Sequence, residues 1–399
     1  MSQERIYSII SDIKHTWFVC LVLLIGMLPL WADGYCMYVL GILLPILILK
    51  VRNYDGMCIL IILYSLAYTL SLFNNGNEFS PSSFIFDLFF PFIMYQSGRY
   101  IIDRQRNPVS SVLLLVFMAI SLALPAIIAN IKDTIESGEL INISRRILDN
   151  VGDTTRNATG YGCMLSIMIG CLGIILVRAN NRIDSKIKII LIVFSILAIY
   201  STIHLLNRTG LALALISIIT VSVIPPYSLR SNIYLILSLV IILAVGAIFF
   251  SDSPFISEAI QLYDKRDEGE GSVASYGGRS ERWEAGINQL ISEPYGNCNG
   301  LYFYGLYTQA HNMWLDAGIF GGLISFVLLV IITIISLRKI LILYNSPILS
   351  PFENRVIILI CIAILAQGAV EPVIQGVPQL FFYYIFFISI IINLYKKYH

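Results

Sequence analysis

Runs of about twenty apolar residues follow one another along most of this chain, and no other feature limits its fold so strongly. Of the 399 residues, 57% are hydrophobic and 13% are charged, whereas soluble domains carry about 25% charged residues. A helix of about twenty residues crosses the hydrocarbon core of a bilayer. The sequence therefore predicts an all-α polytopic membrane protein, a single integral membrane domain over residues 1–399. Twelve transmembrane helices are expected, at 16–32, 35–50, 57–73, 83–101, 110–130, 159–178, 189–206, 209–226, 232–250, 313–337, 354–370 and 376–395.

One arginine, Arg208, interrupts a long apolar stretch, residues 189–226. As a single helix this stretch would be about 60 Å long, about twice the thickness of the hydrocarbon core. An arginine at the bilayer centre costs at least about 2.5–3.5 kcal/mol. We therefore predict two helices, 189–206 and 209–226, joined by a turn near Asn207–Thr209.

The lysines and arginines fix an orientation for these helices. With twelve helices and a cytoplasmic N-terminus, most lysines and arginines fall in short cytoplasmic segments, and several of the outer segments carry none. This distribution satisfies the positive-inside rule and places both termini in the cytoplasm. It also places Arg208 at the outer face of the membrane.

Two outer loops are expected to be large, 131–158 and 251–312. In the second, the stretch GGRSERWEAGINQLIS has apolar residues at helical spacing, which predicts a short amphipathic helix on the outer membrane face. The acidic run Asp264–Glu270 in the same loop is expected to be solvated rather than to bind a cation.

Several common catalytic motifs are absent from the sequence. It has no GxxxxGK[ST], no GxGxxG after a predicted strand, no HExxH, and no DxD pair to hold a metal against a diphosphate. Its cysteines and histidines do not have the spacing of a metal site. We therefore expect no metal, no cofactor and no nucleic-acid partner, and the sequence disfavours nucleotide-driven transport and metalloprotease chemistry.

Four cationic or titratable residues are predicted at the outer face: Arg208, Arg279 and Arg282 in the amphipathic helix, and His311 before the helix at 313–337. Guanidinium groups bind phosphate oxygens as a planar fork, and the start of a helix favours anions. A histidine can accept a proton from a hydroxyl. Together they predict a site for a lipid-linked phosphate or diphosphate. The alternatives are interfacial anchoring by Arg208 and His311, and a solvated face for Arg279 and Arg282.

Other polar residues have simpler interpretations. Asp87 lies within a predicted transmembrane helix, where it is a candidate for function and equally for a structural hydrogen bond. Glu371 falls at a predicted outer turn and is expected to be interfacial. Asn312 and Trp314 are expected to anchor the chain at the membrane interface.

Three motifs, in order, resemble the O-antigen polymerase/O-antigen ligase family. The shared pattern is an arginine opening an apolar helix, an R-x-x-x-W-like stretch leading to a Pro-aromatic-Gly turn, and a His-Asn pair entering a Gly-rich helix. In this chain they are LNRTGLALAL with Arg208, GGRSERWEAGINQLISEPYGNCNG with Arg279, Trp283 and Pro294–Gly296, and HNMWLDAGIFGGL with His311 and Asn312.

The resemblance implies a GT-C-type glycosyltransferase in a Gram-negative inner membrane, with a metal-independent active site facing the periplasm. Its donor would be a glycan on undecaprenyl diphosphate, and direct displacement would invert the anomeric centre. The roles it implies are catalysis by His311, Arg208 and Arg279, diphosphate binding by Arg208, Arg279 and Arg282, and substrate positioning by Asn312 and Trp283.

The acceptor separates two enzymes within this family. A polymerase transfers the glycan to another lipid-linked repeat unit and can work with a chain-length regulator, whereas a ligase transfers it to lipid A-core. We favour the polymerase because the chain is short and has two substantial outer loops. A lipid-linked oligosaccharide flippase is an alternative from another class, although the predicted helices have few polar residues to line a path. A structural membrane protein is a further alternative.

Overall fold

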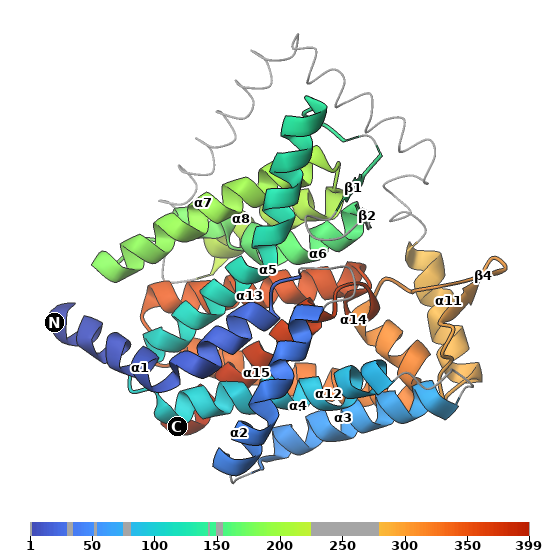
Figure 1. Ribbon diagram of the computed structural model, residues 1–399, viewed down its shortest axis with the longest axis horizontal. Coiled ribbons are helices and arrows are strands. Elements are labelled where there is room, and N and C mark those ends of the chain that lie inside the picture. Colours follow the sequence, from blue (N-terminus) through green and yellow to red (C-terminus); the bar gives the residue numbers. More distant parts are fainter. Residues whose placement is uncertain are drawn as a thin grey trace.

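The chain forms an all-α membrane protein with only two short hairpins among its described residues (Figure 1). The computed structural model describes residues 2–29, 35–51, 54–74, 81–142, 144–148, 155–224 and 279–398. In this part of the chain, seven helices are long and apolar enough to cross a membrane, and three shorter helices are also apolar. The predicted helix 232–250, the acidic run Asp264–Glu270 and most of the second large loop lie outside it.

The first helix begins earlier than expected. Helix α1 starts well before the predicted residue 16 because Asp12, 1% exposed, accepts hydrogen bonds from the backbone N–H groups of Arg106 (2.9 Å) and Asn107 (3.0 Å). That contact fixes the first half of α1 against a turn of the bundle. The elements here are α1 (Ser2–Gly26), η1 (Tyr35–Ile42), α2 (Leu43–Lys50), α3 (Gly56–Asn74) and α4 (Pro81–Arg104).

The middle elements confirm that the stretch around Arg208 forms two helices. The predicted loop 131–158 is partly wrong, because α5 continues to Ser137. No glycine or proline occurs between Pro125 and Gly138, which ends α5 in the left-handed conformation (φ 72°). The elements are α5 (Pro108–Ser137), β1 (Arg146–Leu148), β2 (Thr155–Asn157), α6 (Ala158–Gly170), η2 (Leu172–Leu176), α7 (Arg182–His204) and α8 (Arg208–Val223). Strands β1 and β2 pair antiparallel, Ile147 opposite Arg156.

The predicted helix 313–337 is both longer and interrupted. Helix α12 continues to Tyr344. Gly322 within it has φ 79° and ψ 170°, which are not helical dihedral angles, so the helix is kinked at this residue. The last elements are α11 (Arg279–Ser292), β3 (Leu301–Phe303), β4 (Leu306–Thr308), α12 (Met313–Tyr344), α13 (Pro351–Val370), α14 (Val373–Gly376) and α15 (Pro378–Tyr398).

The interruption at Gly322 admits the Pro-Tyr-Gly turn that follows α11. The Leu323 N–H donates to the Pro294 carbonyl (2.8 Å), and the Asn297 N–H donates to the Ile319 carbonyl (2.6 Å). Gly296 has φ 85°, and a Cβ there would lie 2.7 Å from the Gly322 nitrogen. Both glycines are therefore required for this close approach, which joins the amphipathic helix to α12.

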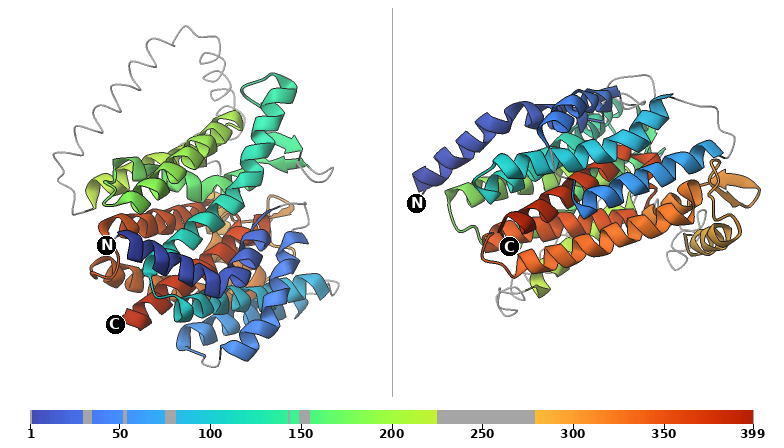
Figure 2. Two further views of the ribbon diagram at one scale, coloured as in Figure 1. Left: turned by 60° about the vertical axis from the view of Figure 1, so that its left-hand side comes forward. Right: turned by 90° about the horizontal axis from the view of Figure 1, so that it is seen from below.

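The helices pack in two groups. Helices α3, α4, α12 and α15 pack against one another, while α5, α6, α7 and α8 form the other group, with α13 packed against α6, α8 and α12. Figure 1 shows α7 and α8 at the top, α13 across the middle and α3 and α12 at the bottom. Figure 2, in its right-hand view, shows α11 and its neighbouring hairpin beyond the ends of α3 and α12.

Candidate functional site

A buried carboxylate, Glu371, gathers three side chains from separate segments of the chain. Its Oε1 accepts hydrogen bonds from Arg279 Nη2 (2.9 Å) and Thr209 Oγ1 (3.1 Å), and its Oε2 lies 3.3 Å from His311 Nδ1. The Glu371 side chain is 3% exposed, whereas Arg279 and His311 are 26% and 21% exposed. We call these four residues the Glu371 cluster; it is partly open at the arginine and the histidine.

The turn after α13 explains why Glu371 points inward. Helix α13 ends at Val370 because Pro372 follows Glu371, and a residue before proline avoids the helical conformation. Glu371 is accordingly extended (φ −137°, ψ 154°), and its N–H still donates to the Gln367 carbonyl (2.9 Å). The expectation that Glu371 is simply interfacial is therefore wrong.

His311 is held in an uncommon backbone conformation. Its φ is 57°, a region that non-glycine residues rarely occupy. The fully buried carboxylate of Asp316 accepts from the N–H groups on both sides, Ala310 (2.7 Å) and Asn312 (3.1 Å). These two bonds fold the chain tightly around His311, and such local strain is found most often at functional sites.

Asn312 positions the site rather than presenting itself to a ligand. Its side-chain oxygen accepts from the Trp314 and Leu315 N–H groups as the N-cap of α12, and its amide donates to the Ala369 carbonyl (3.3 Å). Because Ala369 lies two residues before Glu371, this contact fixes the start of α12 against the end of α13.

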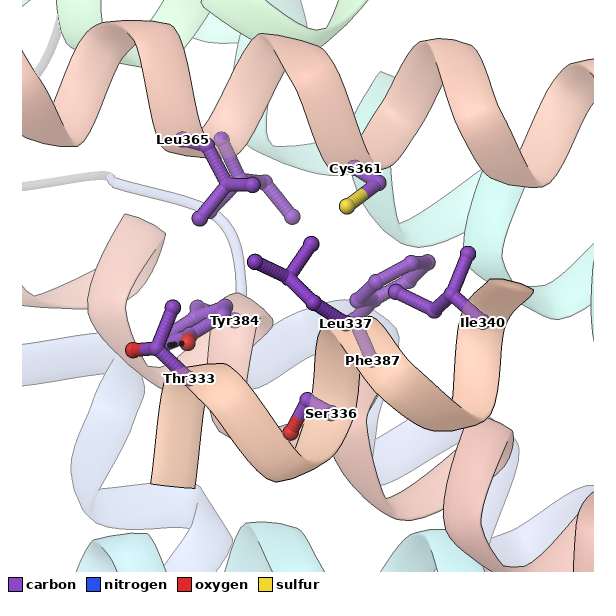
Figure 3. A pocket seen from close by; sticks show the side chains of 9 residues that line it. Thr333, Ser336, Leu337, Ile340, Cys361, Leu365, Tyr384 and Phe387 are labelled. Atoms are coloured by element: carbon purple, nitrogen blue, oxygen red, sulfur yellow. Dashed lines mark hydrogen bonds between the residues drawn. The ribbon is translucent and has the colours of Figure 1, made fainter. Parts of the chain in front are cut away.

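A second chain of hydrogen bonds holds Trp314, near the start of α12, against Thr333 and Tyr384. Trp314 Nε1 donates to Thr333 Oγ1 (2.9 Å), which lies 2.8 Å from the Tyr384 hydroxyl. Figure 3 shows this Thr333–Tyr384 pair at the edge of a small crevice between α12, α13 and α15. The crevice lining is otherwise mostly apolar: Leu337, Ile340, Cys361, Ile364, Leu365 and Phe387, with Ser336. Trp314 therefore has a structural partner in α12, not only an interfacial position.

Arg208 opens α8 as predicted, one residue before the cluster member Thr209. The turn before it contains Leu206 in the left-handed region (φ 50°) and Asn207, whose side chain accepts from the Gly210 N–H (3.1 Å) and donates to the Ala158 carbonyl (2.8 Å). Arg208 itself is half-buried. The structure therefore brings the segment that begins at Arg208 to the same carboxylate as Arg279 and His311.

His204 braces this turn from the other side. The buried imidazole lies between the Leu140 carbonyl (3.0 Å from Nδ1) and the Asp133 carboxylate (2.9 Å from Nε2). The Asn142 N–H donates to the His204 carbonyl (2.7 Å). These contacts tie the segment after α5 to the end of α7, and so fix the position from which Arg208 and Thr209 start.

The predicted site residues on α11 separate into three environments. Arg279 joins the Glu371 cluster, whereas the Arg282 guanidinium lies 5.8 Å from the centre of the Phe303 ring. Trp283 packs on a small core formed by Leu301, Ala310, Leu315 and Ile319. The Trp283 side chain thus holds α11 in place, which is how it contributes to the position of Arg279.

The chemistry open to this cluster follows from its donors and acceptors. An ionised carboxylate only accepts hydrogen bonds, so His311 Nδ1 must carry the proton that faces Glu371, and Nε2 is then the nitrogen able to take a proton. The Arg279 side chain is 26% exposed, so part of its guanidinium stays accessible to an anion. Within the described ranges, no group of three or more His, Cys, Asp or Glu residues could hold a metal ion.

Comparison with known proteins adds no assignment: no protein-family model matches the chain, and no curated protein matches it. The likeness to the O-antigen polymerase/ligase family therefore depends on the three sequence motifs alone.

Sequence reasoning missed Glu371, Thr209 and Asp316. A signal existed for the first, because Glu371-Pro372 directly follows an apolar helix and a carboxylate at such a turn is held close to the helix end. Thr209 and Asp316 carry no such signal, because their roles depend on which segments meet.

Proposed function

We propose that this chain is a membrane glycosyltransferase of the O-antigen polymerase type. It would transfer a glycan from undecaprenyl diphosphate to a hydroxyl of another lipid-linked repeat unit, without a metal or cofactor. In this proposal the protein has twelve transmembrane helices and cytoplasmic termini, lies in a Gram-negative inner membrane and faces the periplasm with the Glu371 cluster. The observation that carries the proposal is the meeting of residues from all three motifs at one carboxylate.

The leaving group sets the first requirement of the reaction. As the bond between the anomeric carbon and the diphosphate oxygen breaks, negative charge develops on the diphosphate, and cations aimed at that charge stabilise the transition state. In this proposal these cations are Arg279, which is fixed by Glu371 yet 26% exposed, and Arg208, at the start of α8. Arg282 faces Phe303, so we assign the diphosphate to Arg208 and Arg279.

The acceptor hydroxyl sets the second requirement. We assign proton removal to His311 Nε2, while Nδ1 donates to Glu371. The carboxylate fixes the tautomer and stabilises the imidazolium that forms. The hydroxyl oxygen forms the new bond to the anomeric carbon, its proton passes to His311, and polyprenyl diphosphate departs. Attack opposite the leaving group inverts the configuration.

A gene replacement distinguishes this function from its alternatives. Loss of the gene is expected to leave lipopolysaccharide capped with single repeat units. Plasmid-borne Arg279→Ala and His311→Ala are expected not to restore long chains, although wild type does. Lipopolysaccharide wholly lacking the repeat unit would indicate a ligase or flippase, and restoration of full-length chains by both variants would contradict the assigned chemistry.

A further inference from the structure

Near the Glu371 cluster lies a small hairpin with exposed aromatic side chains. In β3 and β4, Tyr302 pairs with Tyr307 across the strands, their ring centres 5.3 Å apart. The two residues are 58% and 55% exposed, while Leu301 on the other side of the hairpin is fully buried against the α11 core. One face of the hairpin is thus anchored, and the other presents two adjacent tyrosine rings.

The turn of the hairpin presents a third ring. Tyr304 and Gly305 have φ values of 49° and 81°, the two positive values of a type I′ two-residue hairpin turn. Asparagine, aspartate or glycine usually occupies the first of these positions. Here a tyrosine accepts the unfavourable conformation and remains 83% exposed, with its ring centre 4.3 Å from that of Phe303.

Two contacts place this hairpin next to Arg279. The Tyr304 hydroxyl donates to Glu281 Oε2 (3.2 Å), two residues along α11 from Arg279, and the Glu281 charge raises the pKa of Tyr304. The Arg282 guanidinium lies over the Phe303 ring. The aromatic face therefore begins about one helical turn from the arginine of the Glu371 cluster.

We propose that Tyr302, Tyr304 and Tyr307 form a saccharide-binding surface for the glycan attached to the diphosphate. Sugar rings offer C–H faces that pack on aromatic rings, and their hydroxyls bond to neighbouring carboxylates and phenols, here Glu281 and Tyr304. This inference deepens the function proposed above and rests on it: Arg279 would take the diphosphate, and the hairpin would take the sugars beyond it.

A membrane surface is the competing occupant, and two observations disfavour it. The sequence has no lysine or arginine between Arg282 and Arg338, whereas segments that lie on anionic lipid usually carry basic residues. Figure 2 shows the hairpin beyond the ends of α3 and α12, extending away from the helices rather than along their sides.

Binding of two lipids to the full-length protein in nanodiscs tests the proposal. The probes are undecaprenyl diphosphate carrying the native repeat unit and glycan-free undecaprenyl diphosphate. For Tyr302→Ala/Tyr307→Ala we expect the Kd of the glycan-bearing lipid to rise about tenfold or more, with no change for the glycan-free lipid. Tyr302→Phe/Tyr307→Phe keeps the rings and should stay within about twofold of wild type.

Two controls separate this proposal from the function on which it rests. Arg279→Ala should weaken both lipids, and Ile135→Ala, which changes a residue 76% exposed on α5, should weaken neither. If the alanine pair binds both lipids like wild type, or loses affinity for both equally as a lipid-anchoring surface would, the saccharide surface is wrong. Polymer formation from the lipid-linked repeat unit tests the function separately. If wild type forms polymer and His311→Ala does not, the proposed function stands even when the saccharide surface is wrong. If wild type forms no polymer, that function fails.

Discussion

Two carboxylates, each paired with two basic side chains, lie near opposite ends of the helices. Asp55, just before α3, contacts Lys396 and Arg99 and accepts from the Tyr95 hydroxyl (2.9 Å). Glu371, just after α13, contacts Arg279 and His311. Helix α15 begins near Glu371 and reaches Lys396 at its last turn, so about 30 Å of helix separates the two clusters.

The two clusters are built from different kinds of backbone. Asp55 contacts side chains of two regular helices, Arg99 on α4 and Lys396 on α15. It also accepts a hydrogen bond from the Cys58 N–H (2.7 Å) at the start of α3. Glu371 joins a helix start, an amphipathic helix and the strained residue His311. Regular backbone suits a structural clamp, whereas strained backbone and partial exposure are typical of a site that binds something.

Replacing His311 should cause the largest loss of turnover of any substitution in the two clusters. We expect His311→Ala to lower the turnover of purified protein by about 10²- to 10⁴-fold, the contribution of a general base. The melting temperature in detergent should change little. His15→Ala, at an exposed histidine of α1, is the matched control and should keep wild-type turnover. Equal activity of the two variants would remove His311 from the reaction.

Neutralising the carboxylate should have the next largest effect. Glu371→Gln keeps the size of the side chain but loses the charge that orients Arg279 and His311. We expect turnover to fall on the order of 10- to 100-fold, with Glu371→Asp recovering part of it. Steady-state kinetics check this: a change in KM alone would show that Glu371 acts on binding and not on the histidine.

Substitution of Asp55, at the other end of the helices, should change the stability of the protein and not its turnover. We expect Asp55→Asn to lower the free energy of unfolding by about 1–3 kcal/mol and to leave the turnover of each folded molecule unchanged. Thermal denaturation in detergent measures the first quantity and initial rates the second. A loss of turnover without a loss of stability would place function at this end as well.

The same pair predicts a pH dependence. Burial alone would raise the pKa of Asp55, but Lys396 and the Cys58 N–H outweigh it, and the pKa lies below the usual value of 3.8. A lowered pKa stabilises the fold above the unfolded-state pKa, and this contribution disappears as the pH falls through the folded-state value. The difference in melting temperature between wild type and Asp55→Asn should therefore be full at pH 7 and shrink below about pH 4. A constant difference down to pH 3 would contradict this.

The smallest effect is expected at the edge of the Glu371 cluster. Thr209→Val removes one hydrogen bond to Oε1 while Arg279 remains, so we expect a loss of about two- to tenfold in turnover. Thr220→Val, in the last turns of α8, provides the control for the same substitution in the same helix. A loss as large as that of Glu371→Gln would mean that Thr209 contacts the substrate.

Much of the fold could be predicted because the bilayer constrains it through composition. Apolar runs and caps place most helices within a few residues, and the split at Arg208 follows from length alone. The break at Gly322 could not be predicted, because glycine is common in membrane helices and the break depends on the distant turn at Gly296. Helix count and sidedness stay predictions.

The sequence predicts Arg279 and His311 as residues of the candidate site, but it does not predict that Glu371 lies at the centre of that site. Arg279 and His311 stand out because charge is rare in such a chain, and the structure brings both to one residue. The resemblance implies diphosphate binding by Arg282 and substrate positioning by Trp283, but the Arg282 guanidinium lies over the Phe303 ring and Trp283 packs on the small core. Which side chain faces which partner depends on tertiary packing, and that information is not local.

The most direct test of the central claim is a reaction with purified protein in nanodiscs. The only substrate is the undecaprenyl-diphosphate-linked repeat unit, with EDTA present and no nucleotide. We predict a ladder of lipid-linked polymers, release of undecaprenyl diphosphate, and an inverted linkage, all lost in His311→Ala and Glu371→Ala but kept in Asp55→Asn. Absence of the ladder with wild type, or a ladder made equally well by the His311 and Glu371 variants, would contradict the claim.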